Sequence, residues 1–118
     1  MITLKAINWL DEDSYEGEIT LVDSSQNELI CFSYSVRPED MVLDGIVANV
    51  SSEIVSSDVR NYCLNRIENF AYYVIGNLLD RKRCLVKCFD YLFTLDAYLP
   101  GDLEEGDWIQ FRVGRFDL

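Results

Sequence analysis

The chain has 118 residues, of which 49% are apolar and 26% charged, a composition that predicts one globular domain over residues 1–118 and excludes a disordered chain. Its net charge of −11 disfavours nucleic acid and anionic membrane surfaces as partners, because both carry negative charge. No apolar run reaches the ~18 residues of a membrane span, and the first residues lack the features of a secretory signal, so we expect a cytoplasmic protein.

Alternation of apolar and polar residues predicts three strands in the first third of the chain. They cover residues 2–6, 15–21 and 30–36. Polar turn sequences at 11–14 and 23–27 separate these strands. Such short connections between alternating runs favour antiparallel hairpins.

The pattern changes after Pro38, which cannot donate a hydrogen bond to a strand ladder. Residues 46–50 fit a further short strand, and the serine-rich segment 51–57 fits a loop. Ser57 is a suitable N-cap for a helix over residues 58–68, where apolar residues recur three and four positions apart. The sequence therefore predicts a short helix in this segment.

The last third of the chain predicts strands at 70–79, 84–98 and 108–116. The long segment changes parity between Cys88 and Phe89, which indicates a bulge or bend that carries one strand round a curved sheet. Six strands with a short helix between the third and the fourth predict a mainly β fold. We expect a small six-stranded antiparallel barrel or a strongly curved sheet of OB-like form.

The chain contains no histidine, which excludes histidine-based catalysis. It also contains no Gly-rich phosphate loop and no Rossmann fingerprint. On a strand, Cys84 and Cys88 would lie ~13 Å apart, too far to share a metal ion, whereas on a helix they would be neighbours. If this segment is a strand, the Lys87 side chain points away from the thiols of Cys84 and Cys88 and could not activate them. Carboxylate-pair chemistry stays open among 21 acidic residues. We predict a protein that is not an enzyme and uses no cofactor or metal.

Three further clusters each allow two interpretations. The acids between Asp102 and Asp107 suggest a calcium loop, but their spacing differs from that of an EF-hand and favours a solvated turn. The basic residues between Arg81 and Lys87 would contact an anionic ligand or protect an exposed hairpin end from aggregation. The aromatic residues between positions 70 and 98 would stack on bases or fill the core, and the negative charge favours the core. The first two clusters are Asp102, Glu104, Glu105 and Asp107, and Arg81, Lys82, Arg83 and Lys87.

Negative charge is concentrated in the first half of the chain. Residues 1–59 hold twelve acids and two bases, a net charge of −10, whereas residues 60–118 hold nine acids and eight bases, a net charge of −1. This asymmetry predicts an acidic face, with two aromatic residues beside it as anchors for a partner. The candidate partner-binding residues are Trp9, Asp11, Glu12, Asp13, Tyr15, Glu16 and Glu18. Further acids assigned to the same face are Glu28, Glu39, Asp40 and Asp44.

These observations favour a non-enzymatic interaction module that binds a basic partner protein. In size and charge alone it is comparable to immunity proteins and other small acidic inhibitors. One alternative is a small barrel that binds a ligand in its interior, lined by tyrosine and cysteine side chains. Another is a structural subunit of a homo-oligomer. The acidic half also fits a surface that serves solubility only.

Overall fold

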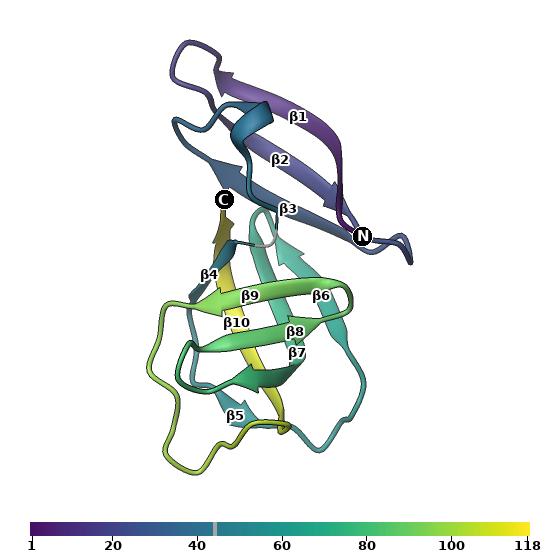
Figure 1. Cartoon of the computed structure of the whole chain (residues 1–118), viewed down its shortest axis with the longest axis vertical. Coiled ribbons are helices and arrows are strands. Elements are labelled where there is room, and N and C mark those ends of the chain that lie inside the picture. The colour runs from purple at the N-terminus through teal and green to yellow at the C-terminus, as the bar shows by residue number, and fades with distance from the viewer. Residues whose placement is uncertain (44) are drawn as a thin grey trace.

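The computed structural model describes residues 1–43 and 45–118. Within these residues the chain forms ten strands and one turn of 3₁₀-helix, and all the strands join a single sheet (Figure 1). The elements are β1 (Thr3–Asp11), β2 (Glu16–Val22), β3 (Glu28–Ser33), η1 (Pro38–Asp40), β4 (Ile46–Val50), β5 (Val55–Ser56), β6 (Cys63–Glu68), β7 (Ala71–Asp80), β8 (Leu85–Cys88), β9 (Tyr91–Leu95) and β10 (Trp108–Asp117). The prediction of a mainly β domain is confirmed.

Five of the strands close into a barrel in the order β4, β9, β8, β7 and β10. The barrel closes because β10 pairs with β4 on one side and with β7 on the other. Strands β7, β8 and β9 are consecutive and antiparallel, whereas β4 and β9 run parallel. Closure pairs the wall strands with one another and so removes exposed edges from this part of the sheet. The prediction of a barrel is confirmed, but its wall has five strands and not six.

Strands β1, β2 and β3 extend the sheet beyond the barrel as an antiparallel meander (Figure 1). Every second residue of β2 and β3 is buried, which gives both strands one inner face. The extension joins the barrel where Phe32 pairs with Asp117. Beside this junction, the Ile30 amide donates a hydrogen bond of 3.0 Å to the Tyr72 hydroxyl. The meander is therefore anchored along β3, while β1 lies at the far side.

One hydrophobic core runs through both parts of the molecule. Leu29 and Cys31 of the extension belong to the same buried cluster as the barrel residues Val86 and Phe111. The Phe93 ring, fully buried on β9, packs 4.5 Å from the ring of Phe116 and 5.8 Å from that of Tyr91. These side chains fill the barrel interior, as expected of a small barrel.

The helix expected over residues 58–68 is wrong. Residues 63–68 form β6, which pairs with β7 from Cys63 to Glu68, and residues 57–62 are irregular with two bends. The Ser57 hydroxyl accepts a hydrogen bond of 3.1 Å from the Val59 amide, so Ser57 caps a turn and not a helix. Pairing with β7, a partner distant from the capping signal, overrides the helical spacing.

The single long strand expected over residues 84–98 is also wrong. Strands β8 and β9 form a hairpin in which Cys88 pairs with Tyr91 across the turn of Phe89 and Asp90. Cys88 and Tyr91 share a face because they are paired, although one has an even and the other an odd number. The two turn residues between them therefore cause the change of parity along the sequence that suggested a bulge. Phe89 adopts a φ of 54°, which a tight turn requires. The OB-like form is not confirmed, because within the described residues the only helical element is η1.

Candidate functional site

The β1–β2 hairpin carries all seven candidate partner-binding residues and divides them between its two faces. Asp11 pairs with Glu16, and Asn8 pairs with Glu18. Because paired residues share a face, the carboxylates of Asp11, Glu16 and Glu18 lie together on the face opposite to Ile19. The register shifts between Trp9 and Asp11, and this bulge turns Asp11 away from the face of Trp9.

The turn between the two strands adds two more acids. Glu12 and Asp13 are exposed there, at the upper end of the molecule in Figure 1. The Asp13 amide donates to the Asp11 carboxylate at 3.0 Å, and the Tyr15 amide donates to the Glu12 carbonyl at 3.3 Å. These bonds fix the turn and leave the Glu12 and Asp13 side chains in solvent.

Trp9 and Tyr15 form an aromatic pair on the other face of the hairpin. Trp9 lies opposite Gly17, and a Cβ at Gly17 would stand only 3.0 Å from the indole, so glycine makes room for the ring. The Tyr15 ring meets the indole edge-on with 5.7 Å between centroids, and the Arg37 guanidinium lies 5.7 Å from the Tyr15 ring. Both rings are half-buried, so the pair presents ordered aromatic edges to solvent.

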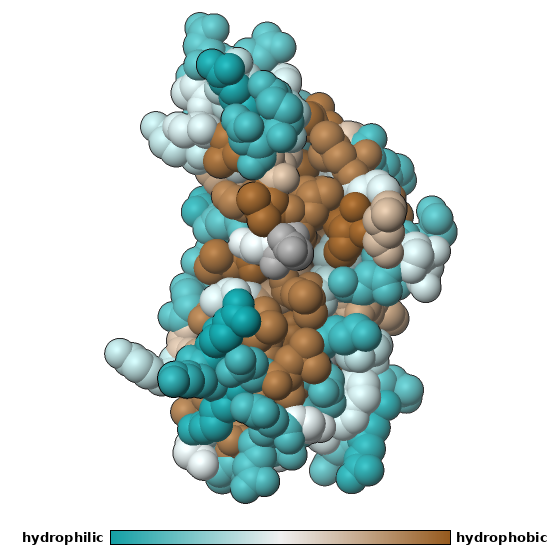
Figure 2. Space-filling view, viewed as in Figure 1, coloured by the Kyte–Doolittle hydropathy of each residue, from teal (hydrophilic) through white to brown (hydrophobic). Residues whose placement is uncertain are grey.

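In the part of the chain that the structure describes, no cation pairs with the hairpin carboxylates. Among the described residues the ion pairs are those of the Met1 amino group with Asp90, Lys5 with Glu28, and Arg115 with Asp117. None of them involves an acid between positions 11 and 18. Figure 2 shows hydrophilic residues gathered at this end, with hydrophobic residues in the middle of the molecule. Crowded carboxylates of this kind produce a negative potential that extends over about a Debye length, ~8 Å at physiological salt.

The other acids assigned to this face are arranged differently. Glu28 is paired with Lys5. Glu39 and Asp40 are exposed on η1. Asp44 lies outside the described residues. Of the described acids assigned to this face, those without an ion-pair partner therefore lie on the β1–β2 hairpin and on η1.

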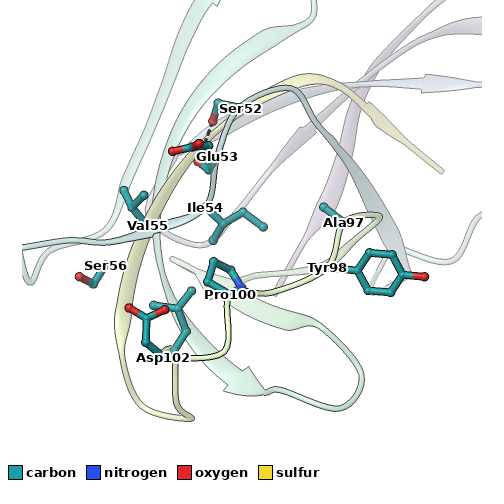
Figure 3. A pocket seen from close by; sticks show the side chains of 10 residues that line it. Ser52, Glu53, Ile54, Val55, Ser56, Ala97, Tyr98, Pro100 and Asp102 are labelled. Atoms are coloured by element: carbon teal, nitrogen blue, oxygen red, sulfur yellow. Dashed lines mark hydrogen bonds between the residues drawn. The ribbon is translucent and has the colours of Figure 1, made fainter.

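A pocket of about 490 Å³ opens at the opposite end of the barrel (Figure 3). Segments 52–56 and 97–103 line it, and its charged groups are the carboxylates of Glu53 and Asp102. Neither carboxylate has a hydrogen-bond or ion-pair partner among the described residues. Tyr98 is fully exposed beside the pocket. The pocket lies on the surface, outside the filled interior in which a barrel ligand was considered.

The basic cluster has a structural member that the sequence did not reveal. The Arg81 guanidinium donates to the carbonyls of Pro100 and Leu103 at 2.9 and 2.6 Å and so fixes the loop before β10. The acids of that loop form a turn, in which the Asp107 carboxylate accepts the Glu104 amide at 2.8 Å. In residues 1–43 and 45–118 no three metal-ligating side chains converge.

Two of the four cysteines are too deeply buried to react. Burial raises the pKa of the Cys88 thiol to about 12 and raises that of Cys31 further. The Cys88 thiol donates to the carbonyls of Cys63 and Ile75 at 3.3 and 3.5 Å. A thiol that stays protonated at neutral pH is neither a nucleophile nor a metal ligand. These cysteines pack as small apolar residues.

The loop between β2 and β3 is attached to the β8–β9 turn through two aspartates. Asp23 is buried and accepts the amides of Ser25 and Asn27 at 3.0 and 2.8 Å. Asp90 is exposed and accepts the hydroxyl and the amide of Ser24, the latter at 3.1 Å. Bonds from the hydroxyl and the amide of Ser24 lower the pKa of Asp90 from 3.8 to about 2, and the terminal amino group adds to the effect.

This contact predicts an acid-dependent contribution to stability. The pKa of Asp90 is lower in the folded state, so the stabilisation is complete above about pH 4 and is lost as the pH falls towards 2. We expect wild type to be more stable than Asp90→Asn at pH 7, with the difference shrinking between pH 4 and pH 2. Urea unfolding of both proteins across this range measures it. A difference that does not change with pH would show that the Asp90 charge contributes nothing.

Within the described residues, no helical segment combines the length and the hydropathy that crossing a bilayer requires. Comparison of the chain with protein-family models, with curated proteins and with solved structures finds no match. The arrangement of the acidic hairpin must therefore be interpreted from its own chemistry.

Proposed function

We propose that the protein is a non-enzymatic interaction module that binds a basic partner protein through the β1–β2 hairpin. One observation carries the proposal: the hairpin holds five carboxylates that have no ion-pair partner among the described residues, together with an ordered aromatic pair on its other face. The carboxylates are those of Asp11, Glu12, Asp13, Glu16 and Glu18, and the pair is Trp9 with Tyr15. A small acidic inhibitor or immunity protein would neutralise a basic effector with a surface of this kind.

The two parts of the hairpin have different tasks in this proposal. The carboxylates attract a basic surface and raise the rate of association, an effect that salt weakens. The Trp9 and Tyr15 edges supply apolar contact area once the partner has docked. Because Arg37 and Gly17 already hold the rings, little side-chain entropy is lost on binding.

The alternatives receive less support from the structure. A ligand inside the barrel would compete with the side chains of Val86, Phe93 and Phe111, which already occupy the interior. Association of two copies through the hairpin would bring like charges together, at a net charge of −11 for each chain. A basic partner would instead be attracted to the hairpin carboxylates.

Charge neutralisation on the hairpin tests the proposal. Partners are captured from lysate of the source organism at about 50 and about 500 mM salt and identified by mass spectrometry. The affinity for a captured basic protein is then measured for wild type and for Asp13→Asn/Glu16→Gln/Glu18→Gln. We expect the triple variant to bind at least about tenfold more weakly, because three attractive charges are lost.

A matched variant separates a local effect from a change in total charge. Asp102→Asn/Glu104→Gln/Glu105→Gln removes the same three charges from the opposite end of the molecule, including one carboxylate of the pocket. We expect this variant to bind nearly as wild type does. Equal weakening by both variants, unchanged affinity of the hairpin variant, or capture of acidic or neutral proteins only would overturn the proposal.

A further inference from the structure

Strand β1 is the terminal strand of the sheet, and one of its edges is open. In the described residues β1 pairs with β2 alone, and no backbone hydrogen bond reaches its other edge. It is nine residues long, and Lys5 is the only charged residue before Asp11. Natural edge strands are usually short or protected by charge, so a long and mostly uncharged edge is a place where another strand can pair.

The register identifies the backbone groups that face outward. The Asn8 carbonyl oxygen lies 2.9 Å from the position that a Cβ of Gly17 would occupy, so this carbonyl points towards β2. In an antiparallel pair, successive residues direct their amide and carbonyl groups alternately towards the partner and away from it. Ile7 and Trp9 therefore direct theirs to the open edge. Register shifts on either side limit the regular run to residues 6–9.

The side chains of the hairpin determine what kind of strand fits. On one face, an added strand would lie beside the apolar side chains of Ile7 and Trp9. On the other, it would lie beside Asn8 and near the carboxylates of Asp11 and Glu18. Successive residues of a strand alternate between faces, so apolar and basic residues must alternate in the segment that binds. A second copy of β1 fits poorly, because it would bring its own hairpin acids to this face.

We infer that the open edge of β1 binds an extended segment of a basic partner protein, with alternating apolar and basic residues, as an additional β-strand. This inference rests on the proposed function and names how the partner is held. The outward amides and carbonyls of Ile7 and Trp9 supply backbone hydrogen bonds, and the hairpin carboxylates select the basic side chains. Trp9 contributes both backbone hydrogen bonds and side-chain contact, because its backbone groups face the open edge and its ring lies on the apolar face.

Two synthetic peptides of equal charge test the inference. The first is a blocked ten-residue peptide of alternating lysine and valine. In the second, proline replaces each valine, the residue that would lie opposite Ile7 or Trp9 on the apolar face, and so removes the amide that would donate to the open edge. We expect the lysine–valine peptide to bind at least about tenfold more tightly, and to slow hydrogen exchange of the Ile7 and Trp9 amides. Equal affinity of the two peptides, no binding of either, or unchanged exchange at both amides would overturn the inference.

Substitution at Ile7 provides an independent measurement. Ile7→Pro removes an outward amide, whereas Ile7→Ala shortens the same side chain and keeps the amide. Both variants lose the apolar contact of the isoleucine side chain, but only Ile7→Pro also loses the outward amide. We therefore expect Ile7→Pro to bind the lysine–valine peptide at least about tenfold more weakly than Ile7→Ala does. The exchange measurement uses wild type and decides the matter if Ile7→Pro does not fold. If a captured basic protein binds in a salt-dependent way without protecting these amides, strand addition fails while the proposed function stands.

Discussion

Replacing Phe93 with alanine is expected to lower the free energy of unfolding by about 3–5 kcal/mol. The ring is fully buried and packs against Phe116 and Tyr91, so its removal leaves a cavity at the centre of the barrel. Phe93 also pairs with Ile46 of β4 and Val86 of β8, which makes it a contact point between both neighbouring strands. Urea unfolding followed by tryptophan fluorescence measures the change.

Tyr98 provides the control for this variant. It is fully exposed in the loop after β9, and Tyr98→Ala is expected to change the free energy of unfolding by less than about 0.5 kcal/mol. Small domains have a total stability of only about 5–15 kcal/mol, so the two variants should differ clearly in denaturation midpoint. A loss below about 1 kcal/mol for Phe93→Ala would contradict a filled barrel interior.

Gly76→Ala is expected to destabilise the protein by about 1–3 kcal/mol, although it adds a single methyl group. A Cβ at Gly76 would stand 2.7 Å from the Lys87 carbonyl oxygen and 2.7 Å from a methyl carbon of Val86. The carbonyl belongs to the backbone of β8, which cannot move away without disturbing its pairing with β7. Thermal and urea unfolding of the variant measure this cost.

Gly101→Ala is the matched substitution. No atom lies within 4 Å of a Cβ placed at Gly101, which is exposed in a turn before β10. Alanine restricts the unfolded chain, so this variant should be unchanged or slightly more stable than wild type. Equal stability of Gly76→Ala and Gly101→Ala would show that β7 and β8 do not approach as closely as the structure indicates.

Local alternation was sufficient to predict most of the strands. The parity of Gly17, Ile19 and Leu21 follows from the sequence, and all three are buried on one face of β2. The same rule located β10, whose apolar residues Ile109, Phe111 and Val113 are buried. Strand β7 was located instead by its run of apolar residues with high β-propensity. An alternating pattern depends only on residues that are close in the chain and on the burial of one face of the strand. It can therefore be recognised in the sequence without knowledge of the partner strands.

Features set by contacts between distant segments were not predictable. The segment that forms β6 has apolar residues at helical spacing, and only its pairing with β7 selects the strand. The order of strands in the barrel depends on β10 reaching β4 and β7 at the same time. Arg81 is a similar case, because its carbonyl partners lie 19 and 22 residues away. No local pattern contains these relations.

The candidate site was predicted in composition but not in geometry. Trp9 and Asp11 have the same parity, so an unbroken strand would place both on one face. The bulge between them moves Asp11 to the face of Glu16. Nothing in the residue types around Leu10 signals this extra residue, since a bulge depends on the register of the partner strand. The separation of aromatic pair and carboxylates therefore became visible only in the structure.

The position of β10 has a consequence for how the protein folds during synthesis. This strand pairs with β3, β4, β5 and β7, and its residues 108–117 follow all of these partners in the chain. The Asn49–Arg115 pair spans 66 residues, which is typical of slowly folding, high-contact-order topologies. Until β10 has emerged from the ribosome, it cannot pair with β4 and β7, and the apolar sides of these strands stay accessible to chaperones or to other nascent chains. We therefore expect closure of the barrel to be delayed until β10 has emerged.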